Sequence, residues 1–382
     1  MEKKVKNYRV CTNCIMDTSD SLIEFDKKGM CDHCHNFYKN IQPNWHPDEK
    51  GTELLAPIVK QIQDSGKNKK YDCIIGLSGG LDSSYVAYYA KEKLGLRPLL
   101  LHVDAGWNTP VSINNVKCIV EGLGLDLETY IVDWEEMKDL QLAFLKSQVP
   151  DADTPQDLAF FSVLYNYAAK NNIKYILTGG NFSTECVREP LEWGSYYATD
   201  TTFAKDVYKK NGNKKLKNFP LSDILKYKIY YRYFKGIRVI KPLDLIPYFK
   251  DKAIEELNDK FGWMPYKHKH HESYFTRFFE TYWLPEKFGY DKRRAHFSSL
   301  ILTGQMSREE ALNRIAQPEV DAETMEHDKD FVCNKLGITR EELQQIFEGK
   351  NKTFRDYKNK YYIITLGTRI MQFLGVEKRK FK

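Results

Sequence analysis

The sequence predicts an α/β protein with a doubly wound, mostly parallel sheet, preceded by a small metal-binding module and followed by helices. Three observations lead to this prediction. Apolar strands alternate with helical stretches between residues 71 and 178, two of those strands end in glycine turns, and two Cys-x2-Cys pairs precede them. We expect the module and its linker at 1–50, the sheet domain at 51–250, and a mostly helical region at 251–382 that completes the substrate site.

Length, charge and hydropathy limit the class of protein. The 382 residues suffice for one large or two ordinary domains, and a net charge of +6 suits a polyanionic ligand such as a nucleotide without requiring nucleic acid. No run approaches the length of a membrane span, and no apolar signal core is present near the first residue. We therefore expect a cytoplasmic protein with no membrane span, whose eight cysteines are thiols and metal ligands before disulfides.

The first element is a cysteine module. Cys11 and Cys14 form one pair, Cys31 and Cys34 the other, and 16 residues separate the pairs. Four thiolates at this spacing predict a closed, tetrahedral and therefore structural zinc site on a small hairpin. Four free thiols, a redox pair, or a nearby histidine in place of one cysteine are the alternatives.

A helix at 52–66 leads to the most informative stretch, 71–84, which predicts a buried strand, a glycine turn and the start of a helix. The residues Ser78, Gly79 and Gly80 allow the backbone to approach an anion, while the following helix contributes the positive end of its dipole. The lysine-containing Walker sequence is absent. The alternative is an ordinary tight turn in which Asp82 is only a helix-start carboxylate.

Further strands are expected at 97–104, 128–132 and 173–178, with helices at 111–123, 135–147 and 155–171 between them. Ligands of such sheets bind at the carboxyl ends of the strands. Two of the expected strands end in polar residues or in a second glycine turn. We predict that these residues contact a nucleotide, and the alternative is that they form loops without a ligand. These candidates are His102, Asp104, Gly179, Gly180 and Asn181, with Glu185 close behind.

Beyond residue 193 the alternation weakens. The lysine-rich stretch at 205–217 shows no evident periodic apolar face, which favours a solvated surface loop over an anion-binding loop. The segment 226–234 predicts an aromatic helix, and amphipathic helices are expected from 307 onward.

A cationic patch lies within 263–294. The residues Lys267 to Glu272 are contiguous and include His268, His270 and His271, and Asp291 to Arg294 follow after an aromatic stretch. Cations gathered beside a carboxylate are favourable near phosphate groups, and histidine can transfer a proton near neutral pH. A metal site and a solvated charged surface are the alternatives.

The string Ser-Gly-Gly-Leu-Asp-Ser-Ser after an apolar strand resembles the PP-loop of the N-type ATP pyrophosphatases, the fold shared by asparagine synthetase and GMP synthetase. Together with the cysteine module, HVDAGW, TGGN and the late block at 269–312, it resembles the N-acetyl sugar amidotransferases (WbpG- or PseA-like) of bacterial surface polysaccharide and O-antigen lipopolysaccharide biosynthesis. The similarity extends over nearly the whole chain.

This resemblance implies a reaction in which ATP adenylates the acetamido oxygen of a nucleotide-linked diacetamido sugar and ammonia then displaces AMP, leaving an acetamidino group. It implies that ATP and Mg²⁺ are held by Ser78, Gly79, Gly80, Asp82, Ser83 and Ser84. In this scheme Asp82 is also catalytic, Lys269 and Arg293 or Arg294 stabilise charge, and His271 or Glu272 manages the proton of ammonia.

The chain contains no glutaminase motif, so the resemblance implies a separate glutaminase subunit with a cyclase-like barrel. The main alternative is a PP-loop enzyme that adenylates a tRNA base for thiolation. In this chain the other four cysteines are scattered and form no third Cys-x2-Cys pair, which counts against this alternative. A nucleic-acid partner is therefore unexpected. A non-catalytic zinc-ribbon scaffold is a further alternative. These motifs distinguish neither the sugar nor the amide that reacts.

Overall fold

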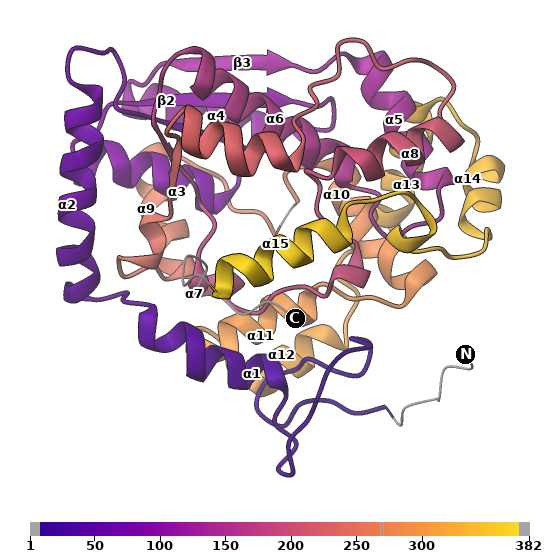
Figure 1. Ribbon diagram of the computed structural model, residues 1–382. Coiled ribbons are helices and arrows are strands. Elements are labelled where there is room, and N and C mark those ends of the chain that lie inside the picture. The colour runs from indigo at the N-terminus through magenta and orange to yellow at the C-terminus, as the bar shows by residue number, and fades with distance from the viewer. Residues whose placement is uncertain (1–7, 268, 270, 374–382) are drawn as a thin grey trace.

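A parallel five-stranded sheet lies at the centre of the protein (Figure 1), in a computed structural model that describes residues 8–267, 269 and 271–373. The strand order is β3-β2-β1-β4-β5, and every neighbouring pair is parallel. The strands are β1 (Cys73–Gly76), β2 (Pro98–Asp104), β3 (Leu127–Ile131), β4 (Tyr175–Leu177) and β5 (Arg238–Ile240). This confirms the predicted sheet.

Strand β1 is the turning point of the topology. Its Ile74 pairs in register with Leu99 of β2 on one side and with Ile176 of β4 on the other. The chain therefore leaves β1 in one direction and returns later on its other side, which opens a crevice at the carboxyl ends of β1 and β4. Both glycine turns follow these two ends.

Helices cover both faces of the sheet because β1 alternates its side chains between two apolar cores. Ile75 packs with α2 (Glu49–Gly66), α3 (Leu81–Tyr88), α4 (Pro110–Leu123) and α9 (Lys250–Phe261). On the opposite face, Ile74 packs with α6 (Thr154–Lys170) and with the aromatic helix Lys226–Phe234. A doubly wound sheet follows, as predicted.

The lysine-rich stretch is not the solvated loop that we predicted over 205–217. Its first part belongs to α8 (Thr201–Asn211), which buries Phe203 and Val207 against Phe144 of α5 (Trp134–Lys146). The backbone that follows is tied down as well, since the Glu136 carboxylate accepts hydrogen bonds from the backbone N–H groups of residues 217–219. The apolar positions four residues apart, hidden among lysines, account for the difference.

The last third of the chain is mostly helical and returns to the same core. Phe275, Phe278 and Trp283 pack with α5 and α8 in the largest apolar cluster. The remaining helices are α7 (Phe182–Glu185), α10 (Tyr274–Phe278) with its continuation Phe279–Phe288, α11 (Arg293–Leu302), α12 (Arg308–Ile315), α13 (Ala322–Leu336), α14 (Arg340–Phe347) and α15 (Tyr361–Phe373). Shorter helical turns complete the order. The domain boundaries at 50 and 250 stay a prediction.

The cysteine module, which includes α1 (Asp32–Asn36), docks on α11 and α12 (Figure 1). Arg308 donates hydrogen bonds to the carbonyl oxygens of Cys11 (2.8 Å) and Cys14 (3.0 Å), and Arg294 pairs with Asp17 at 3.0 Å. Segments nearly 300 residues apart in the sequence thus lie side by side. Among the described residues, no helix is long and apolar enough to cross a membrane.

Candidate active site

The loop after β1 is shaped by Gly79 and two serines. Gly79 has φ +83°, a left-handed conformation, and a Cβ there would lie 2.5 Å from the carbonyl oxygen of Ser112. Ser83 Oγ accepts from the backbone N–H of Ser78 (3.3 Å) and donates to the carbonyl oxygen of Gly80 (3.2 Å). The loop is thereby closed around the amino end of α3, a geometry suited to an anion.

The underside of this loop is fixed by the 263–266 segment. Trp263 Nε1 donates to the carbonyl oxygen of Gly79 (3.2 Å) and to Ser84 Oγ (3.2 Å), and Tyr266 donates to the same carbonyl (3.1 Å). Ser84 is completely buried. Gly79 and Ser84 therefore lie behind the loop and set its shape, whereas the other predicted loop residues face the cavity above it.

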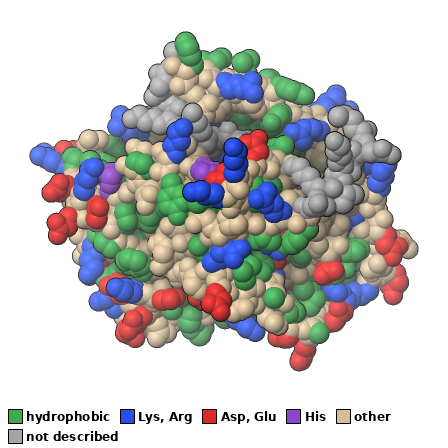
Figure 2. All heavy atoms as spheres, turned by 90° about the horizontal axis from the view of Figure 1, so that it is seen from below, with side chains coloured by type: hydrophobic (Ala, Val, Ile, Leu, Met, Phe, Trp, Pro, Cys, Tyr) green, Lys and Arg blue, Asp and Glu red, His purple; other side chains and the backbone are tan. Residues whose placement is uncertain are grey.

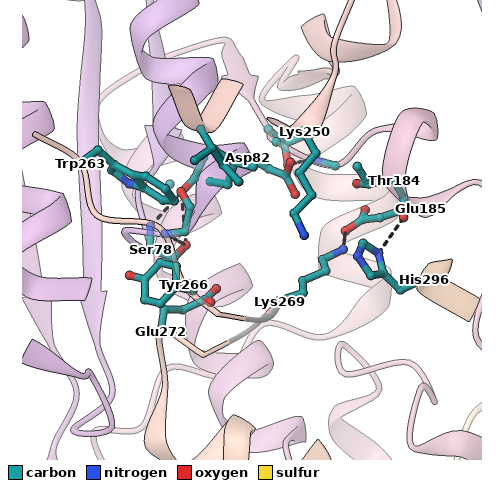
Figure 3. Close-up of a pocket in the computed structure, with 18 residues that line it drawn as sticks. Ser78, Asp82, Thr184, Glu185, Lys250, Trp263, Tyr266, Lys269, Glu272 and His296 are labelled. Carbon is teal, nitrogen blue, oxygen red and sulfur yellow. Dashed lines mark hydrogen bonds and ion pairs between the residues drawn. The ribbon is translucent and has the colours of Figure 1, made fainter. Parts of the chain in front are cut away.

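A cavity of about 230 Å³ lies in the crevice between β1 and β4 (Figure 3). Both glycine turns form its floor. It is lined by Gly76, Ser78, Gly80, Leu81, Asp82, Ser83, Thr178, Gly179, Gly180, Thr184, Glu185, Lys250, Ile254, Trp263, Tyr266, Lys269, Glu272 and His296.

Asp82 is held at this cavity by two contacts that its position in the sequence does not reveal. Its carboxylate accepts a hydrogen bond from Tyr248, and a Cβ on Gly179 would come within 2.8 Å of the Asp82 side chain. The second glycine turn is therefore needed for close packing against α3. Burial raises the pKa of Asp82, and the positive charge of Lys269 opposes this rise.

Two lysines converge at the far side of the cavity (Figure 3). Lys269 Nζ lies 2.6 Å from Glu185 Oε1. Burial acts to lower the pKa of Lys269, but the Glu185 and Asp82 carboxylates raise it above the ordinary value. Lys250 shows the opposite result, because burial and the charges of Arg314 and Lys269 lower its pKa.

A second cavity, of about 400 Å³, adjoins the first. The two share a wall that consists of Thr184, Glu185, Lys250, Lys269 and His296. The second cavity is rich in cations: its lining lysines and arginines are Arg188, Lys241, Lys250, Lys269, Lys292, Arg293 and Arg314. In the view from below (Figure 2), lysine and arginine side chains likewise gather near the centre of the molecular face.

Lys292 lines the second cavity. Its Nζ lies 3.0 Å from Glu189 and 3.5 Å from Glu280, and although burial opposes the charge, these two carboxylates raise the pKa of Lys292. Nearby, Asp151 is completely buried, and burial raises its pKa to about 7. Lys292 and the two glutamates, all of which line the second cavity, therefore form a charged cluster in its wall.

Three of the predicted nucleotide contacts lie outside the first cavity. His102 donates through Nδ1 to the carbonyl oxygen of Leu77 (2.8 Å) and accepts through Nε2 from Asn108 (3.1 Å). Asp104 accepts from the same Asn108 at 3.1 Å, so both residues hold the loop after β2. Asn181 is buried and caps α7 by accepting from the backbone N–H of Thr184 (2.9 Å).

The charged residues of the 263–294 patch also lie in different places. Arg293 borders the second cavity, yet its guanidinium pairs with Asp291 (2.7 Å) and donates to carbonyl oxygens at the end of α12, including that of Gln317 (2.8 Å). Arg294 contacts the cysteine module instead. Glu272 lies over Gly80 in the first cavity, whereas His271 is buried 3.9 Å from Glu319 and lines neither cavity. His268 and His270 lie outside the described residues.

Sequence analysis missed Tyr248, Lys250 and His296. Tyr248 and Lys250 follow β5, which is parallel to β4, so the carboxyl ends of both strands lie at the edge of the sheet that carries the cavity. Their position after a strand of the parallel sheet is the sequence signal that could have identified them. His296 is on α11, where no spacing relates it to the sheet. Its Nδ1 donates to the carbonyl oxygen of Thr184 (3.2 Å), which turns the ring toward the shared wall.

The four predicted metal ligands meet away from these cavities. The sulfur atoms of Cys11, Cys14, Cys31 and Cys34 all lie within 4.8 Å of one another, three of the six pairs are 3.6–3.8 Å apart, and all four residues are buried. A tetrahedron with Zn–S bonds of about 2.3 Å has edges of about 3.8 Å, so the spacing fits zinc. His33 and His35 pair instead with aspartates, at 2.8 and 3.0 Å.

Two protein-family models match this chain. The C-terminal domain of the LPS biosynthesis protein WbpG-like family matches residues 272–371, and NAD synthase matches residues 53–222. The chain is a PP-loop protein with a WbpG-like C-terminal domain. The two matches support an ATP-utilising function of the amidotransferase type in lipopolysaccharide biosynthesis.

Three curated relatives each align with less than half of this chain. It is 25% identical over 192 residues to the NH3-dependent NAD+ synthetase of Fusobacterium nucleatum, covering 46% of this chain and 70% of that protein. An uncharacterized protein of Methanocaldococcus jannaschii is 24% identical, and the match covers 48% of this chain and 63% of that protein. The glutamine-dependent NAD+ synthetase of Thermotoga maritima is 27% identical, and the match covers 41% of this chain and 28% of that protein. The chain thus spans less than two thirds of the latter two.

Two solved structures of synthetases overlap weakly with this chain. The NH3-dependent NAD synthetase of Campylobacter jejuni gives a TM-score of 0.31 at 17% identity, covering 76% of this chain and 97% of its own. The NMN synthetase of Francisella tularensis gives a TM-score of 0.28 at 19% identity, covering 59% of this chain and 96% of its own. Scores this low add nothing to the assignment, which rests on the family models.

Proposed function

We propose that the protein is an ATP-dependent, AMP-forming amidotransferase that converts an acetamido group of a nucleotide-linked diacetamido sugar to an acetamidino group in bacterial surface polysaccharide biosynthesis. The observation that carries this proposal is the wall shared by the two cavities. ATP would occupy the cavity over the PP-loop, and the sugar nucleotide would occupy the cation-rich cavity beside it. Lys250 and Lys269 would then lie where the two substrates meet.

In the first step the amide oxygen attacks the α-phosphorus of ATP, a new oxygen–phosphorus bond forms, and the bond to pyrophosphate breaks. The loop from Ser78 to Ser83 and the amino end of α3 would bind the leaving pyrophosphate. Lys250 and Lys269 would offset the negative charge that builds up around the α-phosphate.

The first cavity also offers oxygen ligands for Mg²⁺. Asp82 and Glu272 both line it, and carboxylate oxygen is the donor that this ion prefers. When bound, Mg²⁺ would neutralise charge on the pyrophosphate. Tyr248 would orient Asp82 for this role through the hydrogen bond that it donates.

In the second step ammonia adds to the imidate carbon and AMP leaves, so ammonia must lose protons to the protein or to water. Glu272 and His296 line the first cavity, and His296 also lines the second. Because Nδ1 of His296 donates to Thr184, Nε2 is the nitrogen that can accept a proton. We place His296 and Glu272 ahead of His271 for this task.

The ammonia would come from a separate glutaminase subunit with a cyclase-like barrel. This part of the proposal rests on the sequence, in which no cysteine lies in a nucleophile elbow.

Product analysis tests the proposal. The full-length protein is incubated with ATP, Mg²⁺, ammonium chloride and a panel of UDP-linked 2,3-diacetamido sugars, and products are identified by mass spectrometry. We expect AMP together with the mass change of oxygen replaced by NH. Formation of ADP, or of AMP without any modified sugar across the panel at saturating ammonium, would contradict the proposal.

A further inference from the structure

The aromatic helix Lys226–Phe234 turns an apolar face toward solvent. Side chains of this helix, of the residue before it and of the edge strand β5 are 40 to 77% exposed, namely Leu225, Ile229, Tyr230, Tyr233, Phe234 and Val239. Leu225, Ile229 and Tyr233 are four residues apart, so they lie on one side of the helix. A helix that belonged wholly to the core would turn such side chains inward.

The opposite side of the same helix is bound to the body of the protein. Tyr231 is 1% exposed and donates a hydrogen bond from its hydroxyl to Oδ1 of Asn166 on α6 (2.6 Å). Tyr165 donates to the hydroxyl of Tyr227 (2.8 Å), and the centroids of these two rings are 4.6 Å apart. The inner contacts therefore fix which side of the helix faces outward.

A groove of about 650 Å³ lies between this helix and α6. Its lining combines the apolar side chains of Ile229 and Tyr230 with three lysines, Lys170, Lys226 and Lys235. Apolar and cationic groups thus share one depression in the surface.

The charges of this surface have one sign. Residues 224–243 contain six lysines and arginines and no aspartate or glutamate. The acidic residue that precedes them, Asp223, is engaged by Lys360 (2.5 Å) and Thr201 (2.7 Å). Among the described residues, no carboxylate forms an ion pair with four of the surrounding cations, Lys170, Arg232, Lys235 and Arg238. An apolar face among unneutralised cations matches the two components of an anionic membrane surface, acyl chains and phosphate groups.

We propose that the aromatic helix and the cations around it bind the surface of an anionic lipid bilayer. The helix would lie in the plane of the membrane, with its apolar face at the boundary between headgroups and acyl chains, and the lysines of the groove would contact lipid phosphates. The proposal does not depend on the enzymatic function.

Two other occupants fit this surface less well. A second copy of the chain would bring the cations of one copy against the same cations of the other across a two-fold contact. A single-stranded nucleic acid would also use aromatic rings and cations, but the exposed aliphatic side chains of Leu225, Ile229 and Val239 offer no ring on which a base could stack.

Vesicle flotation with the full-length protein tests the inference. We expect the protein to float with vesicles of about three parts phosphatidylcholine to one part phosphatidylglycerol, and much less with pure phosphatidylcholine. Ile229→Ser combined with Phe234→Ser removes apolar surface without changing the charge and should lower the bound fraction about fivefold. Arg232→Gln combined with Arg238→Gln should lower it as well, as should raising NaCl from about 0.1 to 0.5 M.

The matched control is Leu54→Ser combined with Ile113→Ser. These two exposed side chains belong to α2 and α4, which pack on the other face of the sheet, so the control should float like the wild type. Thermal unfolding of each variant establishes that it is folded. Failure of the wild type to float on anionic vesicles, or an equal loss in the control and in the Ile229→Ser, Phe234→Ser variant, would overturn the proposal. So would binding of a single-stranded oligonucleotide at about 0.15 M NaCl while vesicles stay unbound, since the surface would then serve a nucleic acid.

Discussion

Lys250 and Lys269 enter the first cavity from opposite sides, and among the described residues only Lys269 has a carboxylate in contact, that of Glu185 at 2.6 Å. Their pKa values are shifted in opposite directions. One lysine is therefore held charged by its partner, while the other loses its proton more readily than a lysine in water. This difference makes their contributions separable by pH.

We expect AMP formation to fall on the alkaline side as Lys250 loses its proton. Its pKa is lowered by burial first, so this fall should begin at a lower pH than the ordinary lysine value allows. In Lys250→Arg the charge persists, and the alkaline fall should move upward, which a pH profile of kcat records. The paired Lys269→Arg should leave the fall where it is. An unchanged profile in Lys250→Arg would remove Lys250 from the reaction.

Asp82→Asn should lower AMP formation about 100-fold or more, because an amide cannot replace a carboxylate as a metal ligand and charge partner. Tyr248→Phe keeps the carboxylate and removes only the hydrogen bond to it, so a smaller loss is expected. Pyrophosphate release measures both, and circular dichroism checks the fold. Full activity of Asp82→Asn would exclude Asp82 from the metal site.

Cys31→Ser should lower the zinc content and the thermal stability together. The four thiolates share one site, and the loss of a ligand should cost roughly 5 to 10 °C in Tm. Metal analysis and a thermal scan provide the measurement. Cys118→Ser, a half-buried thiol outside the cluster, is the control and should retain the metal. Unchanged zinc in Cys31→Ser would rule out a four-cysteine site.

Asp151→Asn should flatten the dependence of stability on pH. Burial raises the pKa of Asp151 to about 7, whereas an aspartate in the unfolded chain titrates near 3.9. Between these values the folded state holds the proton and the unfolded state has lost it, so this residue lowers stability as pH rises from about 4 to 7. Urea unfolding at several pH values measures the effect. Equal slopes for wild type and variant would show that Asp151 does not titrate in this range.

Sequence patterns predict the parallel sheet and the PP-loop because both depend on neighbours in the chain: an apolar strand, a glycine turn and a helix start. The residues that complete the cavity come from elsewhere. Tyr248 reaches Asp82 across 166 positions, and His296 reaches Thr184 across 112. No local periodicity encodes such contacts.

The late patch shows the same limit. Lys269 and Arg293 look alike in the sequence, but one side chain lies at the shared wall while the other is engaged by Asp291 and by carbonyl oxygens at the end of α12. Both cations are paired with a carboxylate, Lys269 with Glu185 and Arg293 with Asp291, so what differs is the place that the fold gives them, which composition does not report.

The cysteine module can dock on α11 and α12 only after the ribosome has made these two helices. Arg308 contacts Cys11 and Cys14 across 297 and 294 positions. At roughly 5 to 20 residues per second, the ribosome needs about 15 to 60 s to make the docking surface after the cysteines have emerged. During that interval the four thiols are not yet covered by α11 and α12. Early metal binding would protect them from oxidation until the last third of the chain has been synthesised.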